Sequence, residues 1–303
     1  MEPAPILLFV YNRPQHVKRG LASLLQNAET GNSELYVFSD AARSAADEDA
    51  VRQVREIVRG TTGFKQVHII ERAENWGLAR NVIDGVSTVV NRHGRVIVLE
   101  DDLVVSPYFL RFMNEALETY ADEPRVGHIQ ACDFTQDTTL PDTFLIQWTG
   151  SWGWATWQRA WTHFNPDGRE LLRQLEERRL TRRFDFNGTY GFTRMLRRQT
   201  KGKNNSWAIR WNASLFLKDI LSLNVGRSLV SNEGLDGSGT NSLSGDPYVS
   251  RLWMKPLEVK KISPVEENEA ARSAYERYYG RTNNLWVKIP RRLRSMIKGY
   301  FRF

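Results

Sequence analysis

The feature that most constrains the fold is the alternation of short apolar runs with amphipathic stretches in the first hundred residues. The apolar runs are residues 6–11, 35–38, 67–70 and 96–99. The stretches with apolar residues at helical spacing include residues 17–25, 47–58 and 78–90. This strand–helix order predicts an α/β fold with a parallel, doubly wound sheet and right-handed crossovers.

The fourth apolar run ends abruptly in Glu100, Asp101 and Asp102. Its β-branched composition is typical of a strand that is buried on both faces of a parallel sheet. Ligands bind at the carboxyl ends of such strands. Because three adjacent carboxylates repel one another there, a divalent cation carrying phosphates would relieve the repulsion. Strand alternation would put Glu100 and Asp102 on one face and Asp101 on the other. The alternative is an acidic turn that faces solvent.

Polar residues also follow the other predicted strands. They are Asn12 and Arg13, Asp40, and Asn75, with Tyr11 beside the first pair. Carboxyl ends of parallel strands gather at one edge, so these residues could form a single site. Arg13 or Arg80 could pair with a diphosphate, and Asp40 could accept from a uracil N–H or a ribose hydroxyl. Each could instead be a cap or turn residue. Neither a dinucleotide-binding glycine motif nor a P-loop is present.

The net charge of +7 is concentrated at the C-terminus. Residues 281–303 hold seven basic residues and no acid, which leaves 35 of the 42 basic residues against 35 acidic ones. The balanced remainder argues against nucleic acid as a partner. The single cysteine, Cys132, excludes an intramolecular disulfide and fits a reducing, cytoplasmic compartment. Neither a signal peptide nor a membrane span is expected.

The basic tail has a helical pattern in which apolar and basic residues lie on opposite sides. The apolar arc holds Ile289, Leu293, Met296, Ile297, Tyr300 and Phe303. This pattern predicts an amphipathic helix that binds an anionic membrane surface, so we expect a peripheral protein on the inner face of the cytoplasmic membrane. The alternative is a terminal helix that packs on the body of the protein.

Several motifs together point to one family. They are residues 9–14 (FVYNRP), 38–40 (FSD), 75–80 (NWGLAR), 98–103 (VLEDDL) with Ser106-Pro107, 153–157 (GWATW), 206–211 (SWAIRW) and 229–234 (LVSNEG). With these motifs the chain resembles the nucleotide-diphospho-sugar (GT-A) glycosyltransferases. The likeness is to the branch of eukaryotic N-acetylglucosaminyltransferase I and similar bacterial polysaccharide enzymes, and it covers about residues 5–245.

The resemblance implies a GT-A, Rossmann-like sheet with a mixed acceptor-side half, to which the pattern of the basic tail adds a C-terminal amphipathic helix. The predicted boundaries are 1–125 for nucleotide-sugar binding, 126–262 for the acceptor and catalysis, and 263–303 for the helical tail, basic and amphipathic from about residue 281. It also implies an inverting hexosyl- or N-acetylhexosaminyltransferase that uses a UDP-sugar with Mn²⁺ or Mg²⁺. Its acceptor would be a glycan or lipid-linked molecule, and its role bacterial surface polysaccharide synthesis.

The resemblance also assigns roles to individual residues. Asp102 would be the metal ligand, with Glu100 and Asp101 supporting the ribose and the donor sugar. Arg13 and Asp40 would hold the nucleotide.

Tryptophans are concentrated in the second half, with four between residues 152 and 161. Aromatic rings stack on the apolar faces of sugars, and glycine allows a ligand to approach the backbone. This pattern predicts a sugar- or acceptor-binding set of Trp152, Gly153, Trp154, Trp207 and Arg210. The alternative is a tryptophan-rich core under a loop.

An inverting transfer needs a general base for the acceptor hydroxyl. In the related enzymes an aspartate commonly precedes the tryptophan that corresponds to Trp207, whereas this chain has Asn204-Asn205-Ser206. Asparagine cannot act as a base, so Asp133 is the expected substitute, followed by Asp185 and Asp236. Two other functions stay open: a non-catalytic sugar- or lipid-binding protein on a degenerate transferase fold, and a sugar-1-phosphate nucleotidyltransferase.

Overall fold

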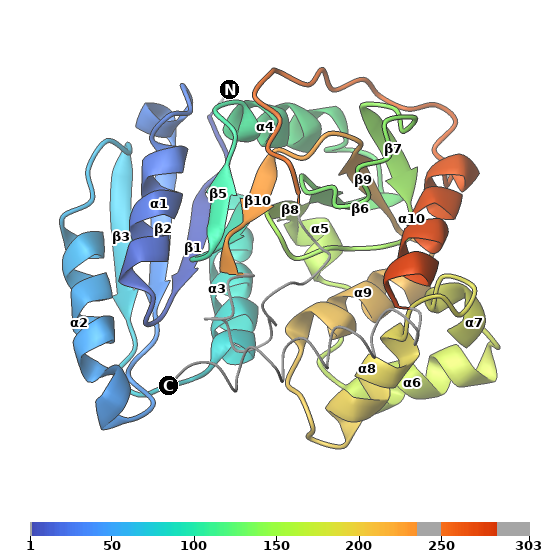
Figure 1. Ribbon diagram of the computed structural model, residues 1–303, viewed down its shortest axis with the longest axis horizontal. Helices are drawn as coiled ribbons and strands as arrows, with labels where there is room; N and C mark the ends of the chain where they lie inside the picture. The colour runs from blue at the N-terminus through green and yellow to red at the C-terminus, as the bar shows by residue number, and fades with distance from the viewer. Residues whose placement is uncertain (1, 235–249, 284–303) are drawn as a thin grey trace, which may run out of the picture.

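The computed structural model describes residues 2–234 and 250–283. The first hundred residues alternate strand and helix along the chain (Figure 1). The elements are β1 (Ile6–Val10), α1 (Pro14–Leu24), the 3₁₀ turn η1 (Thr30–Asn32), β2 (Glu34–Ser39), α2 (Ala45–Arg59), β3 (Gln66–Glu71), α3 (Leu78–His93) and β4 (Arg95–Glu100).

The second half mixes short strands with a group of helices. Its strands are β5 (Leu103–Val105), β6 (Val126–Gln130), β7 (Thr143–Ile146), β8 (Trp154–Trp157), β9 (Leu221–Val225) and β10 (Val230–Asn232). Its helices are α4 (Phe109–Thr119), α5 (Gln158–Trp161), α6 (Gly168–Glu177), α7 (Thr181–Phe184), α8 (Phe192–Thr200), α9 (Trp207–Leu217) and α10 (Glu269–Thr282).

One eight-stranded sheet runs through both halves in the order β3-β2-β1-β4-β8-β6-β9-β7. The first four strands are parallel, whereas β8 is antiparallel to both of its neighbours, β4 and β6. A separate antiparallel pair joins β10 to β5. The predicted mostly parallel α/β sheet with a mixed second half is therefore confirmed. The short strand β5 follows the acidic turn, and α4 begins at Phe109, just after Ser106-Pro107.

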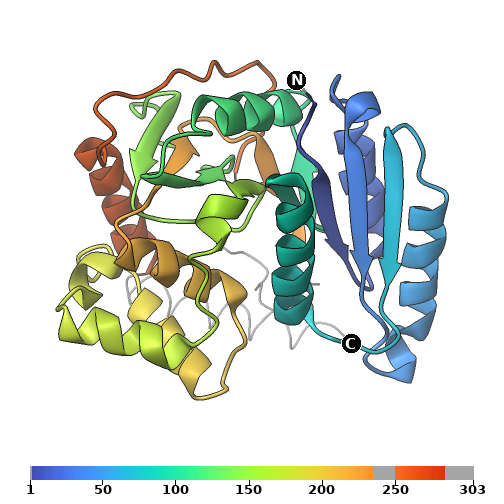
Figure 2. The same ribbon diagram turned by 180° about the vertical axis from the view of Figure 1, so that it is seen from behind.

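Strand alternation divides the first half into two apolar layers. Ile6, Leu8 and Val10 of β1 pack into a core with α1, α2 and α4. Leu7 and Phe9 face the opposite side, where α3 covers the sheet (Figure 2). The α3 helix lies close to the strands at Gly85, where a Cβ atom would be only 2.9 Å from the Phe9 ring.

A third apolar core holds the helices α6 to α10 against β7. It is rich in aromatic rings, which include Phe134, Phe144, Trp148, Phe184, Phe186, Phe192, Tyr275 and Tyr279. Of the helices in residues 2–234 and 250–283, none is long and apolar enough to cross a membrane.

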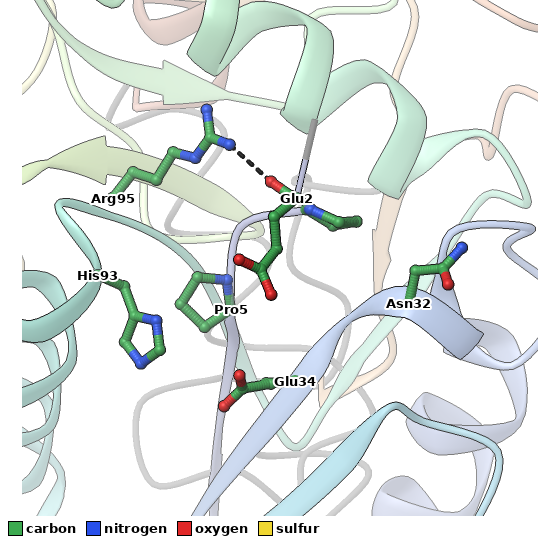
Figure 3. A pocket seen from close by; sticks show the side chains of 7 residues that line it. Glu2, Pro5, Asn32, Glu34, His93 and Arg95 are labelled. Carbon is green, nitrogen blue, oxygen red and sulfur yellow. Dashed lines mark hydrogen bonds between the residues drawn. The ribbon is translucent and has the colours of Figure 1, made fainter.

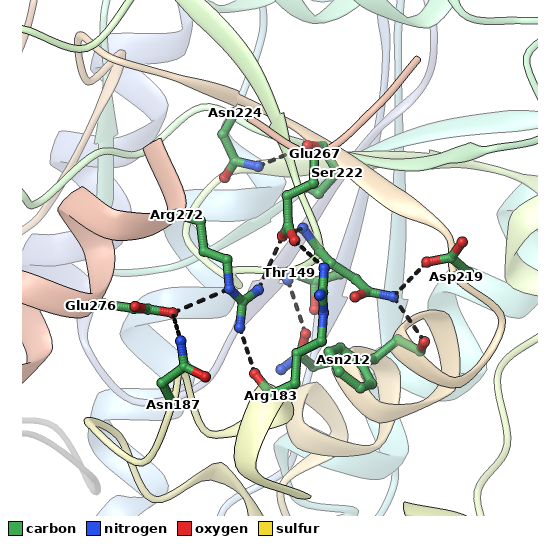
Figure 4. A network of polar contacts seen from close by, with 12 residues as sticks. Thr149, Arg183, Asn187, Asn212, Asp219, Ser222, Asn224, Glu267, Arg272 and Glu276 are labelled. Carbon is green, nitrogen blue, oxygen red and sulfur yellow. Dashed lines mark hydrogen bonds and ion pairs between the residues drawn. The ribbon is translucent and has the colours of Figure 1, made fainter. Parts of the chain in front are cut away.

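A buried polar network attaches α10 to the sheet (Figure 4). Arg272 is 4% exposed and forms ion pairs with Glu267 at 3.0 Å and Glu276 at 3.2 Å. Glu267 also accepts a hydrogen bond of 2.7 Å from the backbone N–H of Gln147, and Arg183 pairs with its other oxygen at 2.6 Å. The network therefore joins α10, the segment after β7 and the α7 turn through one buried cation.

Candidate active site

The three acids lie at the carboxyl end of β4, in the middle of the sheet. Glu100 is the last strand residue and lies opposite Phe9 of β1, and Asp101 and Asp102 form the turn that leads into β5. Arg13, at the start of α1, donates through Nη2 to Asp101 Oδ1 and, at 3.1 Å, to Asp102 Oδ2. The two aspartates therefore share one guanidinium group. The prediction that they face opposite sides is wrong, because the extended backbone ends at Glu100.

The cluster holds more negative charge than Arg13 can neutralise. Burial, followed by the charges of Asp102 and Asp101, raises the pKa of Glu100 to about 8. Burial also raises the pKa of Asp101 to about 6, although the Arg13 guanidinium opposes this shift. A proton or an added cation at this point of the sheet would therefore be favourable.

The raised pKa of Glu100 predicts a pH effect on the stability of metal-free protein. A carboxyl group that holds its proton more tightly when folded than when unfolded favours the folded state in acid, and this contribution is lost as the pH rises from about 4.5 toward about 8. We expect Glu100→Gln to match the native chain at about pH 5 and to melt about 3 °C higher or more at about pH 8. Thermal unfolding in a chelator measures this difference. Glu56→Gln, at an exposed site on α2, is the control, and parallel pH profiles for native chain and Glu100→Gln would contradict the effect.

The donor set fits a divalent cation that shares its ligands with a substrate. Among residues 2–234 and 250–283, no three His, Cys, Asp or Glu side chains are grouped so that they alone could hold a metal ion. Mg²⁺ and Mn²⁺ commonly take only one or two carboxylates, with water and phosphate oxygens as the other ligands. The Asp102 side chain is 14% exposed, and the buried Arg13 Nη1 has no hydrogen-bond partner among residues 2–234 and 250–283. Asp102 could therefore hold a cation while Arg13 offers a free N–H group.

Gly234, to which the sequence motifs assigned no role, packs directly on Asp102. A Cβ atom on Gly234 would lie 2.2 Å from Asp102 Oδ2, so only glycine leaves room for this carboxylate. The preceding residue, Glu233, donates its backbone N–H to the Asp102 carbonyl oxygen at 2.8 Å and pairs with Arg19 of α1. The signal in the sequence was the glycine that ends the LVSNEG motif.

The other residues predicted for the nucleotide hold the loops at this edge of the sheet. Asp40 is 5% exposed and accepts from the backbone N–H groups of Trp76 and Gly77, both at 2.8 Å. Asn75 donates to the Ala41 carbonyl oxygen at 2.7 Å. These bonds fasten the loop before α3 to the end of β2.

Asn12 and Tyr11 make a similar attachment to the start of α2. Asn12 Nδ2 donates to Asp47 at 2.8 Å, and the Tyr11 hydroxyl accepts from the backbone N–H of Arg43 at 3.0 Å. Tyr11, Asn12, Asp40 and Asn75 therefore lie at the carboxyl edge of the sheet, as predicted for a nucleotide site. In the structure each of them also forms a hydrogen bond that holds a neighbouring loop or helix start.

The tryptophan-rich segment is mostly core. Trp154 is 0% exposed and stacks between His128 and Trp207, with ring centroids 5.3 and 5.2 Å away. Trp207 is itself 4% exposed. Both rings lie in the apolar core that the sheet shares with α3 and α9, which favours the alternative of a tryptophan-rich core over contact with an acceptor. Trp152 is only partly buried, and Gly153 has a positive φ of 67° and packs on Val230.

The predicted bases have different surroundings. Asp133 is 4% exposed, its oxygens accept from Thr135 and Gln136, and burial raises its pKa. Asp185 accepts from the Thr193 backbone N–H at 2.6 Å, so it caps the start of α8. Asp236 lies outside the residues that the structure describes.

A small cavity of about 90 Å³ lies at the opposite edge of the sheet (Figure 3). Its lining includes Pro5, Glu34 and Arg95, which come from the amino ends of β1, β2 and β4. It is therefore separate from the acidic cluster.

A mostly parallel α/β sheet with carboxylates at the end of a central strand is the arrangement of GT-A glycosyltransferases. The chain belongs to glycosyl transferase family 2, whose family model matches residues 6–201. No curated protein matches the chain.

Two solved structures are similar over part of the chain. The first is the mannosyltransferase PcManGT from Pyrobaculum calidifontis in complex with GDP-Man and Mn²⁺, at 16% identity and a TM-score of 0.36, over 58% of this chain and 47% of that one. The second is TarS from S. aureus, at 14% identity and a TM-score of 0.32, over 46% of this chain and 23% of that one. The chain therefore covers less than half of either solved chain.

Proposed function

We propose that this protein is an inverting glycosyltransferase that moves a hexosyl or N-acetylhexosaminyl group from a nucleotide diphosphate to a glycan or lipid-linked acceptor. The observation that carries this proposal is the cluster of Glu100, Asp101 and Asp102 at the carboxyl end of β4, in which the two aspartates share a single arginine. Membership of family 2 supports nucleotide-sugar transfer. The motif resemblance to the N-acetylglucosaminyltransferase I-like branch favours UDP as the nucleotide and bacterial surface polysaccharide as the product.

In this mechanism Asp102 and Arg13 have separate roles at the diphosphate: one binds the metal ion and the other binds phosphate oxygens. Asp102 would hold Mn²⁺ or Mg²⁺, which when bound supplies positive charge for the diphosphate leaving group. Arg13 orients Asp101 and Asp102 and has Nη1 left for a phosphate oxygen. Asp40 and Asn75 keep the loop before α3 in place beside the nucleotide.

A panel of nucleotide sugars, each with and without Mn²⁺, tests the proposal. A ligand that binds only the folded state raises the melting temperature, so the correct donor should stabilise the protein in the presence of Mn²⁺. Release of the nucleotide then separates an enzyme from a pure sugar-binding protein. Stabilisation by no nucleotide sugar under either condition would contradict the proposal.

Asp133 is the proposed general base, because burial raises its pKa toward the range that suits proton transfer. We expect Asp133→Asn to leave donor affinity nearly unchanged and to lower transfer by about 10²-fold. Initial rates and donor titrations measure the two quantities. The neighbouring, more exposed Asp137 provides the matched control, Asp137→Asn.

Asp133 also organises a turn, so a second variant separates the two roles. Thr135→Val removes a hydroxyl that donates to Asp133 at 2.9 Å but keeps the carboxylate. An equal loss of transfer in both variants, with equal loss of stability, would show a structural role only.

Residues 281–303 would place the enzyme on an anionic membrane surface near a lipid-linked acceptor. This part of the proposal rests on the sequence pattern, since residues 284–303 lie outside the described part of the chain.

A further inference from the structure

A groove of about 500 Å³ separates α3 from the start of α9. One wall is formed by Trp76, in the loop before α3, and by Arg80, Ile83 and Ser87 on one face of α3, and the facing wall includes Arg210. Ligand sites of small molecules commonly have volumes of this order. One end of the groove lies near the carboxyl edge of the sheet, because Trp76 lines the groove and donates its backbone N–H to Asp40 at the end of β2.

The wall from α9 carries a buried cation without an acid partner. Arg210 is 7% exposed, and in the described part of the chain its guanidinium group donates to neutral oxygens: the Ser206 and Pro166 carbonyls and Asn205 Oδ1, at 3.1 to 3.3 Å. Within residues 2–234 and 250–283 no carboxylate forms an ion pair with it. Burial accordingly lowers the pKa of Arg210, and no neighbouring charge opposes this shift. A buried charge of this kind is costly unless a counter-ion binds.

The wall from α3 offers a second cation that is already held in position. The Arg80 guanidinium carbon lies 3.7 Å from the Trp76 ring centroid, and Arg72 lies over the same ring at 3.7 Å. Among the residues that the structure describes, the acid partner of Arg80 is Glu74, at a distance of 3.6 Å, and the Arg80 side chain is 58% exposed. Asp84, the acid in the groove lining, is paired with Arg72. The charge that the groove offers to a ligand is therefore positive.

We propose that this groove binds an oxyanion on a sugar, a carboxylate or a phosphate ester, through Arg210 and Arg80. The inference rests on the proposed function, in which the anionic sugar belongs to the acceptor. Guanidinium groups bind both oxyanions by paired, charge-assisted hydrogen bonds. Ala79 and Ile83 supply apolar surface for the sugar ring beside them.

Ligand-observed NMR titration of the full chain tests the site without donor or metal. The probes are glucuronic acid and glucose 1-phosphate, with glucose as the neutral control. We expect the anionic sugars to bind and glucose not to bind, and the tighter anion identifies the carboxylate or the phosphate. Arg210→Gln should weaken binding about tenfold or more, and Arg80→Gln about threefold.

Two controls keep the outcome specific. Arg52, on α2, is 59% exposed and matches Arg80, so Arg52→Gln should bind like the native chain. Asp102→Asn should also bind the anionic sugars normally, which separates a failure of this groove from a failure of the metal site. Equal binding of glucose, no binding of either anion, or unchanged affinity in Arg80→Gln would overturn the proposal, even if Arg210→Gln fails to fold.

Discussion

Asp102→Asn is expected to abolish Mn²⁺-dependent binding of the nucleotide-sugar donor and to lower transfer by about 10³-fold. Asp102 is the acid of the cluster that combines partial exposure with a long, 3.1 Å bond to Arg13, so it can exchange this partner for a cation. An amide has the same shape but lacks the charge that a divalent ion requires. Calorimetric titration of donor with and without Mn²⁺ measures the loss.

The variant should keep its fold, because asparagine can still accept from Arg13. Asp49→Asn, at a site with a 67% exposed side chain on α2, is the matched control and should bind donor normally. If the metal-dependent affinity of Asp102→Asn equalled that of the native chain, Asp102 would not be the ligand.

The second large effect concerns stability. Replacing Arg272 with alanine should lower the free energy of unfolding by about 3–5 kcal/mol, because the buried Glu267 and the half-buried Glu276 would lose the buried cation between them. The loss should include the attachment of α10 to the segment after β7, since Glu267 also holds the Gln147 backbone. Urea unfolding followed by circular dichroism measures the change.

An exposed arginine on the same helix gives the comparison. Arg277 has a 56% exposed side chain and pairs with Asp137 at 3.3 Å, so Arg277→Ala should cost about 1 kcal/mol or less. The double variant Arg272→Met with Glu267→Gln should recover part of the loss, because it removes the buried charges together. Equal destabilisation by Arg272→Ala and Arg277→Ala would show that burial of the network adds nothing.

The sequence predicts well where periodicity is strong. The apolar spacing of residues 47–58 predicts α2, and that of residues 78–90 predicts α3. It fails at β5 and β8, which are only three and four residues long. Such short strands are defined by their partners across the sheet, and a local pattern cannot show these partners.

In the candidate site, too, the features set by the local sequence could be predicted, and those set by contacts between distant segments could not. The acids at the end of β4 follow from the strand that precedes them, whereas their shared bond to Arg13 depends on how the turn bends. The burial of Trp154 could not be predicted, because the helix that covers it starts 53 residues later in the chain, at Trp207. The space that Gly234 leaves for Asp102 likewise depends on a contact between distant segments.

The position of β8 between β4 and β6 has a consequence for how the chain folds during synthesis. Until residues 154–157 emerge, the β4 backbone has an unpaired edge on the side where Arg95 later pairs with Trp157 and Val98 with Trp154. An open edge on an apolar strand can pair with other chains and begin aggregation. Pairing of β8 with β4 is also slow, because residues 101–153 separate the two strands in the sequence and the ends of this segment must come together first. The nascent first half is thus the stage at which a chaperone would protect this protein most.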